Sequence, residues 1–117
     1  MSMNMVGRSV IFVTKVGSRS TFELTIKNND GTVKDLSNNT QYATGKWKVW
    51  QPNGTLLING NIAYSDRPNG LITYTLGSTD TTSDKVGVWE GEVELKDTDG
   101  VISEQTQSFN FIIEESY

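Results

Sequence analysis

Three glutamates on one predicted strand have the spacing that could support acid–base chemistry. Glu90, Glu92 and Glu94 alternate with apolar residues between Val86 and Lys96. Successive side chains of a strand point to opposite faces, so the three carboxylates share one face, with neighbours about 6.5–7 Å apart. A glycosidase acid–base pair has a similar separation, but it also needs a cleft that raises one pKa, and the sequence predicts none. We therefore interpret the row as a solvated outer face.

The sequence contains no histidine and no cysteine. It therefore has no Ser-His-Asp or Cys-His nucleophile, no imidazole base near neutral pH and no histidine-containing zinc site. It also has no disulfide framework and no thiolate chemistry. An enzyme would have to work with carboxylates, lysine and tyrosine. We expect a protein that is not an enzyme and that binds no cofactor.

Asp97, Asp99 and Gly100 have the spacing that begins a calcium-binding loop. No acidic residue follows at the bidentate position, and no helices flank the segment. Asp–Gly and Asn–Gly pairs are typical of hairpin turns, in which the glycine adopts a positive φ. We therefore predict a turn and no metal site.

The aromatic residues could also stack on a carbohydrate. Most of them fall on predicted inward faces, where core packing is the expected role. Trp50 is the exception, because Trp47 and Val49 already occupy the inner face of its strand. An outward tryptophan beside Pro52 is either covered by a loop or lies in a contact surface. The residues that we assign to partner binding are Lys48, Trp50, Gln51 and Pro52.

The elements that must position these residues are strands, because short apolar and polar alternations recur between turn signals. Seven to eight strands at intervals of about 8–12 residues are typical of a β-sandwich or a small barrel. The segment from Val86 to Ile113 is predicted to be a hairpin that supplies one wall of the core. The other predicted strands are 9–16, 21–27, 46–51, 55–58, 61–64 and 71–76, with a loop at 37–45 that Tyr42 anchors.

Composition limits the partners. The net charge is −4 and the isoelectric point is about 4.7, and the ten basic residues are scattered, so neither nucleic acid nor an anionic membrane is an expected partner. The first residues lack the apolar core of a signal peptide, and no apolar run is long enough to span a bilayer. We expect one domain over residues 1–117, with an ordered core over about 9–114.

The order of several short motifs resembles a known family. These motifs are Asp30-Gly31, Lys34-Asp35-Leu36, Lys46-Trp47-Lys48-Val49, Gln51-Pro52-Asn53-Gly54-Thr55, Gly70-Leu71-Ile72-Thr73-Tyr74-Thr75-Leu76, Gly87-Val88-Trp89-Glu90-Gly91-Glu92-Val93-Glu94-Leu95, Asp99-Gly100 and Phe109-Asn110-Phe111. Together they resemble the N-terminal immunoglobulin-like domain of upper baseplate proteins from the tails of phages and prophages of Gram-positive bacteria. The likeness spans about residues 9–114.

The resemblance implies an all-β, immunoglobulin-like antiparallel β-sandwich without catalytic residues. It further implies a structural protein of the virion tail, assembled in the bacterial cytoplasm. Such a protein would dock to other tail or baseplate proteins and support the receptor-binding apparatus, and a homo-oligomer is also open. The alternative hypothesis is a carbohydrate-binding module that recognises host cell-surface polysaccharide through a planar row of exposed aromatic rings.

Overall fold

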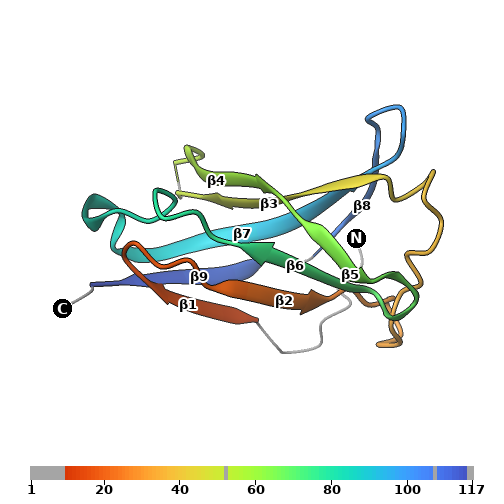
Figure 1. Cartoon of the computed structure of the whole chain (residues 1–117), viewed down its shortest axis with the longest axis horizontal. Helices are drawn as coiled ribbons and strands as arrows, with labels where there is room; N and C mark the ends of the chain where they lie inside the picture. The colour runs from red at the N-terminus through yellow and green to blue at the C-terminus, as the bar shows by residue number, and fades with distance from the viewer. Residues whose placement is uncertain (1–9, 52, 107, 116–117) are drawn as a thin grey trace.

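A computed structural model describes residues 10–51, 53–106 and 108–115 of the chain. Nine strands in this described part form two packed sheets, and the protein is therefore an all-β sandwich (Figure 1). The strands are β1 (Ile11–Lys15), β2 (Thr21–Thr25), β3 (Thr44–Trp50), β4 (Leu56–Asn61), β5 (Ala63–Asp66), β6 (Leu71–Thr75), β7 (Gly87–Lys96), β8 (Ile102–Gln105) and β9 (Phe109–Glu114). Two short 3-10 turns, η1 (Arg67–Asn69) and η2 (Ser83–Lys85), precede β6 and β7.

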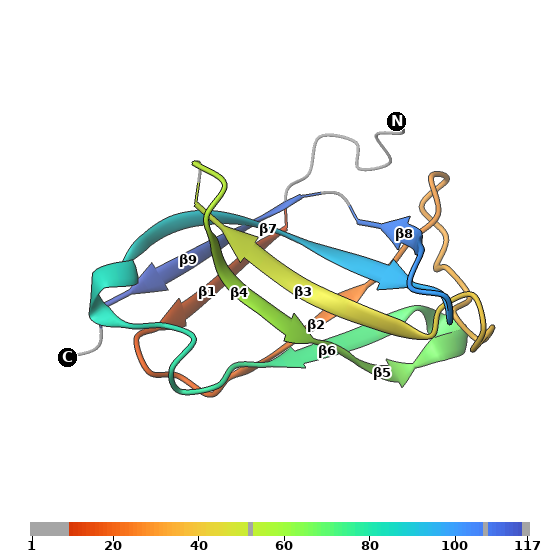
Figure 2. The ribbon, with the colours of Figure 1, turned by 90° about the horizontal axis from the view of Figure 1, so that it is seen from above.

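The larger sheet has the strand order β1-β9-β7-β3-β4, and β8 also pairs with β7. The smaller sheet has the order β2-β6-β5. The chain crosses from the larger sheet to the smaller one between β1 and β2, and again where β4 leads into β5, as Figure 2 shows from above. An immunoglobulin-like sandwich packs a GFC-type sheet against a BED-type sheet, here β9-β7-β3-β4 against β2-β6-β5, and β1 joins the larger sheet beside β9.

The predicted hairpin over Val86–Ile113 forms, but its second arm is divided. β8 pairs with the C-terminal half of β7 and β9 pairs with the N-terminal half, both antiparallel. At the break, the Val93 N–H donates to the hydroxyl of Thr106 at 2.8 Å, and the Thr106 N–H donates to the Val93 carbonyl at 2.9 Å. A side-chain oxygen thus replaces a backbone acceptor, which interrupts the ladder between the two strands.

The first strand departs from the antiparallel prediction. β1 pairs with β9 in parallel, with Val13 opposite Ile112. A parallel edge pair joins segments from the two ends of the chain, and no local pattern in the sequence marks such a pair. The apolar run of this strand is nearly continuous, so its alternation alone does not decide which face points inward. The structure places Phe12 against the core and leaves Ile11 and Val13 exposed.

The core lies between the two sheets and is centred on Trp47. Its indole stacks on the rings of Phe22 and Tyr74, with centroid distances of 6.1 and 5.6 Å. The alternating apolar residues of the strand at 71–76 are buried, and those of the C-terminal hairpin form a wall of the core, as predicted. Val33 is exposed although it is apolar. It forms an isolated bridge with Lys27, which holds it at the surface.

Two residues hold the loop before β3: Tyr42, which the sequence suggested, and Arg67, which it did not. Tyr42 is buried, as predicted. Arg67 of η1 donates from Nη1 to the carbonyl oxygens of Leu36 and Tyr42, both at 3.0 Å. Its guanidinium also lies 3.8 Å from the centroid of the Tyr64 ring. Arg67 therefore connects the two sides of the loop, Leu36 and Tyr42, by hydrogen bonds to their carbonyl oxygens.

Candidate functional site

The glutamate row, Lys48 and Trp50 lie on the outer face of the larger sheet, the face that points away from the core. This outer face divides into two halves of different chemistry. The half nearer β8, which we call the polar half, carries charged and amide side chains. Its residues are Lys46, Lys48, Asn59, Asn61, Glu92, Glu94, Lys96 and Gln105.

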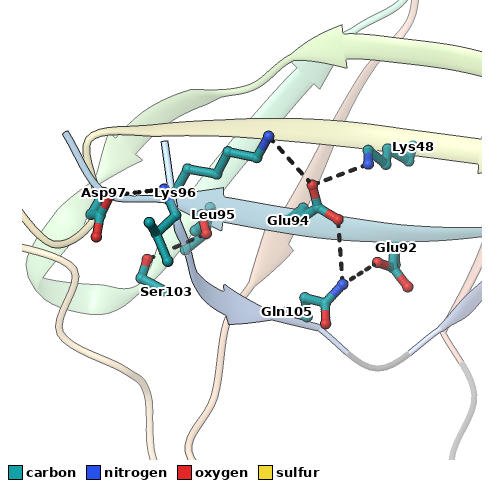
Figure 3. A network of polar contacts seen from close by, with 9 residues as sticks. Lys48, Glu92, Glu94, Leu95, Lys96, Asp97, Ser103 and Gln105 are labelled. Atoms are coloured by element: carbon teal, nitrogen blue, oxygen red, sulfur yellow. Dashed lines mark hydrogen bonds and ion pairs between the residues drawn. The ribbon is translucent and has the colours of Figure 1, made fainter. Parts of the chain in front are cut away.

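Glu94 is the centre of the polar half. Lys48 approaches a Glu94 carboxylate oxygen at 3.0 Å, and Lys96 approaches the same oxygen at 4.0 Å. Gln105 of β8 donates to the other Glu94 oxygen at 3.3 Å and to Glu92 at 2.9 Å (Figure 3). The network therefore joins β3, β7 and β8 through side chains.

The prediction that the glutamate row is a solvated face is wrong at Glu94. Only Glu90 is exposed, Glu92 is half-buried, and Glu94 is buried beneath its partners. The reason is β8, an unpredicted separate strand that brings Gln105 across the row. Burial, and secondarily the charge of Glu94, raise the pKa of Glu92 above its ordinary value, while the Gln105 hydrogen bond and Lys48 oppose that rise.

The glutamates do not line the best-formed pocket of the described residues. That pocket, of about 240 Å³, lies between β2 and the β8–β9 segment and is lined in part by Leu24, Ile26 and Phe109. The carboxylates instead lie on an open sheet face. The arrangement offers them ion pairs and hydrogen bonds rather than an enclosed reaction site.

In the turn after β7, the Asp97 carboxylate is hydrogen-bonded to the backbone of the turn itself. Asp97 accepts hydrogen bonds from the N–H groups of Asp99 and Val101, at 2.9 and 3.0 Å. Gly100 has a φ of 81°, a conformation that favours glycine, as the turn prediction requires. Within the described ranges, no group of three acidic, histidine or cysteine side chains is placed to hold a metal ion.

Two of the residues assigned to partner binding, Lys48 and Trp50, share the outer face of β3. Trp50 lies half-buried on the outer face, and Trp47 and Val49 are buried, as the alternation predicted. Lys48 shares the outer face but belongs to the Glu94 network. Gln51 begins the turn after β3, and its N–H donates to the Thr55 carbonyl at 2.9 Å. Pro52 lies outside the described residues.

The rings do not form an exposed row in the part of the chain that the structure describes. The two other tryptophans and the tyrosines at 42 and 74 are buried. Tyr64 is half-buried beneath the Arg67 guanidinium. Tyr117 lies outside the described residues. Trp50 is therefore the single described tryptophan that could contact a partner, and the planar platform expected of a carbohydrate-binding module is not found there.

The other half of the outer face is apolar, which the sequence analysis missed. We call it the apolar half and define it by Ile11, Val13, Trp50, Leu56, Val88 and Ile112. Four of these side chains are strongly exposed, at 55% for Ile11, 49% for Val13, 48% for Leu56 and 64% for Val88. One signal was present in the sequence, since Val88 has the same strand parity as Glu90 and must share its outward face.

Comparison with known proteins gives structural likenesses only. No protein-family model and no curated protein matches the sequence. The N-terminal domain of the ORF48 protein of phage TP901-1 superposes with a TM-score of 0.70 at 14% identity, covering 93% of this chain and 91% of that chain. CopC from Methylosinus trichosporium OB3b gives a TM-score of 0.49 at 16% identity, covering 93% and 88%. The first likeness establishes that this chain shares the fold of a phage protein domain. No helix of the described residues combines the length and apolar character needed to cross a bilayer.

Proposed function

We propose that this chain is a non-enzymatic structural protein of a phage or prophage tail. Its sandwich docks to neighbouring tail or baseplate subunits and supports the receptor-binding apparatus. The observation that carries the proposal is the likeness to the phage ORF48 N-terminal domain, which extends over nearly the full length of both chains. The motif order noted in the sequence supports the same assignment independently of the fold.

The site chemistry supports a docking role. The carboxylates of the polar half are held by ion pairs and hydrogen bonds within the sheet, and Asp97 is used by its own turn. What the surface offers to a partner is the half-buried Trp50 and the exposed aliphatic side chains beside it. Exposed apolar surface of this kind on a small protein is typical of an interaction site.

The experiment is to locate the protein in particles. Purified virions from cells that carry the gene are labelled with antibody and imaged by electron microscopy, and virions from a gene-deleted strain serve as the control. We expect label at the tail tip, and tails without an intact tip in the deletion strain. Complete, infective tails without this protein would overturn the proposal.

A further inference from the structure

We propose that the apolar half of the outer face is the docking surface, and that its partner is a different protein with an apolar patch and a lysine or arginine that pairs with Glu90. This inference rests on the proposed function. It goes further by assigning the surface and the chemistry of the partner. It keeps Trp50 from the predicted contact and replaces its other members by apolar residues of β1, β4, β7 and β9.

Strand register places the members of the apolar half in two neighbouring cross-strand rows, and Asn110 and Glu90 interrupt the first of them. One cross-strand row runs from Ile11 through Asn110, Glu90 and Trp50 to Leu56. The next row places Val13 beside Ile112, and Ile112 beside Val88. Directly opposed side chains on one face of a sheet lie about 4.5–5.5 Å apart, so these two rows form one surface rather than scattered exposed residues.

Glu90 gives this surface its polarity. Its side chain is exposed, and no ion pair or side-chain hydrogen bond to it is found among the described residues. A partner that covers Trp50 and Val88 must also remove water from the carboxylate between them. Burying an unpaired carboxylate is strongly unfavourable, so the partner must supply a cation. The neighbouring indole of Trp50 favours the same group, because a guanidinium or ammonium can also lie over an aromatic ring.

The charges around the patch argue against a second copy of this chain. Glu90 and Glu114 are exposed on the outer face, and Lys15 is the cation of the adjoining β1. Lys15 lies directly opposite Glu114 in register, which leaves Glu90 as the uncompensated charge. Two copies placed face to face would bury two Glu90 carboxylates without a cation, between chains that each carry a net charge of −4. A basic rim on a different protein complements this surface, and like charges across an interface oppose association.

The test uses the full chain and the purified structural proteins encoded beside it, each immobilised singly for a binding measurement. Val88→Lys places a charge in the apolar half, and Glu90→Gln removes the carboxylate with little change of shape. Asn59→Lys is the matched control, because Asn59 is exposed on the same sheet but lies in the polar half. All three sites are at the surface, and thermal melts verify that each variant folds.

For the tail protein that binds the parent chain, we expect Val88→Lys to weaken affinity at least about tenfold. Glu90→Gln should weaken it about three- to tenfold and reduce its dependence on salt. Asn59→Lys should change affinity less than about twofold, as a charge outside the contact does. A complementary Glu90→Lys variant should bind a partner whose cation is replaced by glutamate more tightly than it binds the parent partner.

Three results would overturn the inference and leave the proposed function standing. The first is weakening by Asn59→Lys but not by Val88→Lys. The second is full affinity of Glu90→Gln at every salt concentration, which would show that no lysine or arginine of the partner pairs with Glu90. The third is a dimer of the isolated chain, seen by light scattering and dissociated by Val88→Lys, which would make a second copy the occupant. If none of the tail proteins binds the parent chain, both the inference and the proposed docking function fail.

Discussion

The ammonium of Lys48 lies 3.0 Å from a carboxylate oxygen of Glu94, whose side chain is only 7% exposed. The two residues are diagonal neighbours, because Lys48 stands directly opposite Glu92 in the β3–β7 register. The pair therefore links adjacent strands at a point where the backbone ladder alone would leave a buried negative charge. Such a charge is tolerated in a protein only when it is paired and hydrogen-bonded.

Removing the Lys48 charge should destabilise the fold. Lys48→Met leaves Glu94 with the more distant Lys96 and one hydrogen bond from Gln105. We expect the free energy of unfolding to fall by about 1–3 kcal/mol, the cost of leaving a buried polar group partly unsatisfied. Urea denaturation measures this loss. Lys46→Met is the control, and an equal loss in both variants would show that the Glu94 pair is not the cause.

Glu92 should make stability depend on pH in the direction opposite to a salt-bridged carboxylate. Burial raises the pKa of Glu92 above the ordinary value of glutamate, so the folded state binds the proton more tightly than the unfolded state does. The contribution of Glu92 to the free energy of unfolding is fully present below the ordinary pKa of glutamate. It is lost as pH rises through the raised pKa of the folded state. Near pH 7 the ionised group therefore opposes folding.

Glu92→Gln should then increase stability near pH 7, by no more than about 0.5 kcal/mol because solvent screens a half-exposed site. The amide oxygen can still accept the Gln105 hydrogen bond. The gain should shrink to zero as pH falls below the ordinary pKa of glutamate. Thermal melts of both proteins between about pH 3 and pH 8 measure it. A gain that persists at the acid end would mean that the carboxylate charge is not responsible.

Strand alternation alone predicted which side chains of β3 and of the C-terminal hairpin fill the core. Trp47 and Val49 face inward and Trp50 outward because side-chain direction follows from parity along a single strand. The same argument correctly buried Phe109 and Phe111 in the C-terminal hairpin. The likeness to the phage ORF48 domain concerns the fold, at 14% sequence identity.

Parity could not predict how exposed an outward residue is, because exposure depends on distant strands. Glu90 and Glu94 share one face, yet β8 covers the second and leaves the first in solvent. The exposed aliphatic residues of β1 were missed for a related reason. Their outward direction is fixed only when β1 joins β9 in parallel, a pairing between the two ends of the chain.

Close packing makes Gly91 sensitive to any side chain. A Cβ at this position would lie 2.4 Å from the Phe109 ring and 2.8 Å from the backbone oxygen of Lys48. Gly91→Ala should therefore destabilise the protein by about 1–3 kcal/mol, the usual cost of overpacking a core. Gly77→Ala is the control, because its Cβ would meet only the Asp80 carboxyl at an ordinary 3.7 Å. Equal unfolding midpoints for the two variants would contradict this packing.

Trp47 and Trp50 provide a comparison of core and surface within one strand. Trp47 is fully buried between the Phe22 and Tyr74 rings, whereas Trp50 is half-buried on the outer face. Trp47→Ala should cost about 3–5 kcal/mol, which can unfold a domain of ordinary stability. Trp47→Phe keeps part of the stacking and should leave a folded protein whose loss can be measured by denaturation.

Trp50→Ala should lower the free energy of unfolding by less than about 1 kcal/mol, because this site is at the surface. The same substitution should weaken docking to the tail partner, since exposed tryptophans are often central to interfaces. Stability measured by urea denaturation and affinity measured on the same preparations separate the two roles. The contrary outcome is a Trp50→Ala protein that binds normally but loses as much stability as Trp47→Phe. Trp50 would then be a packing residue and would not belong to the docking surface.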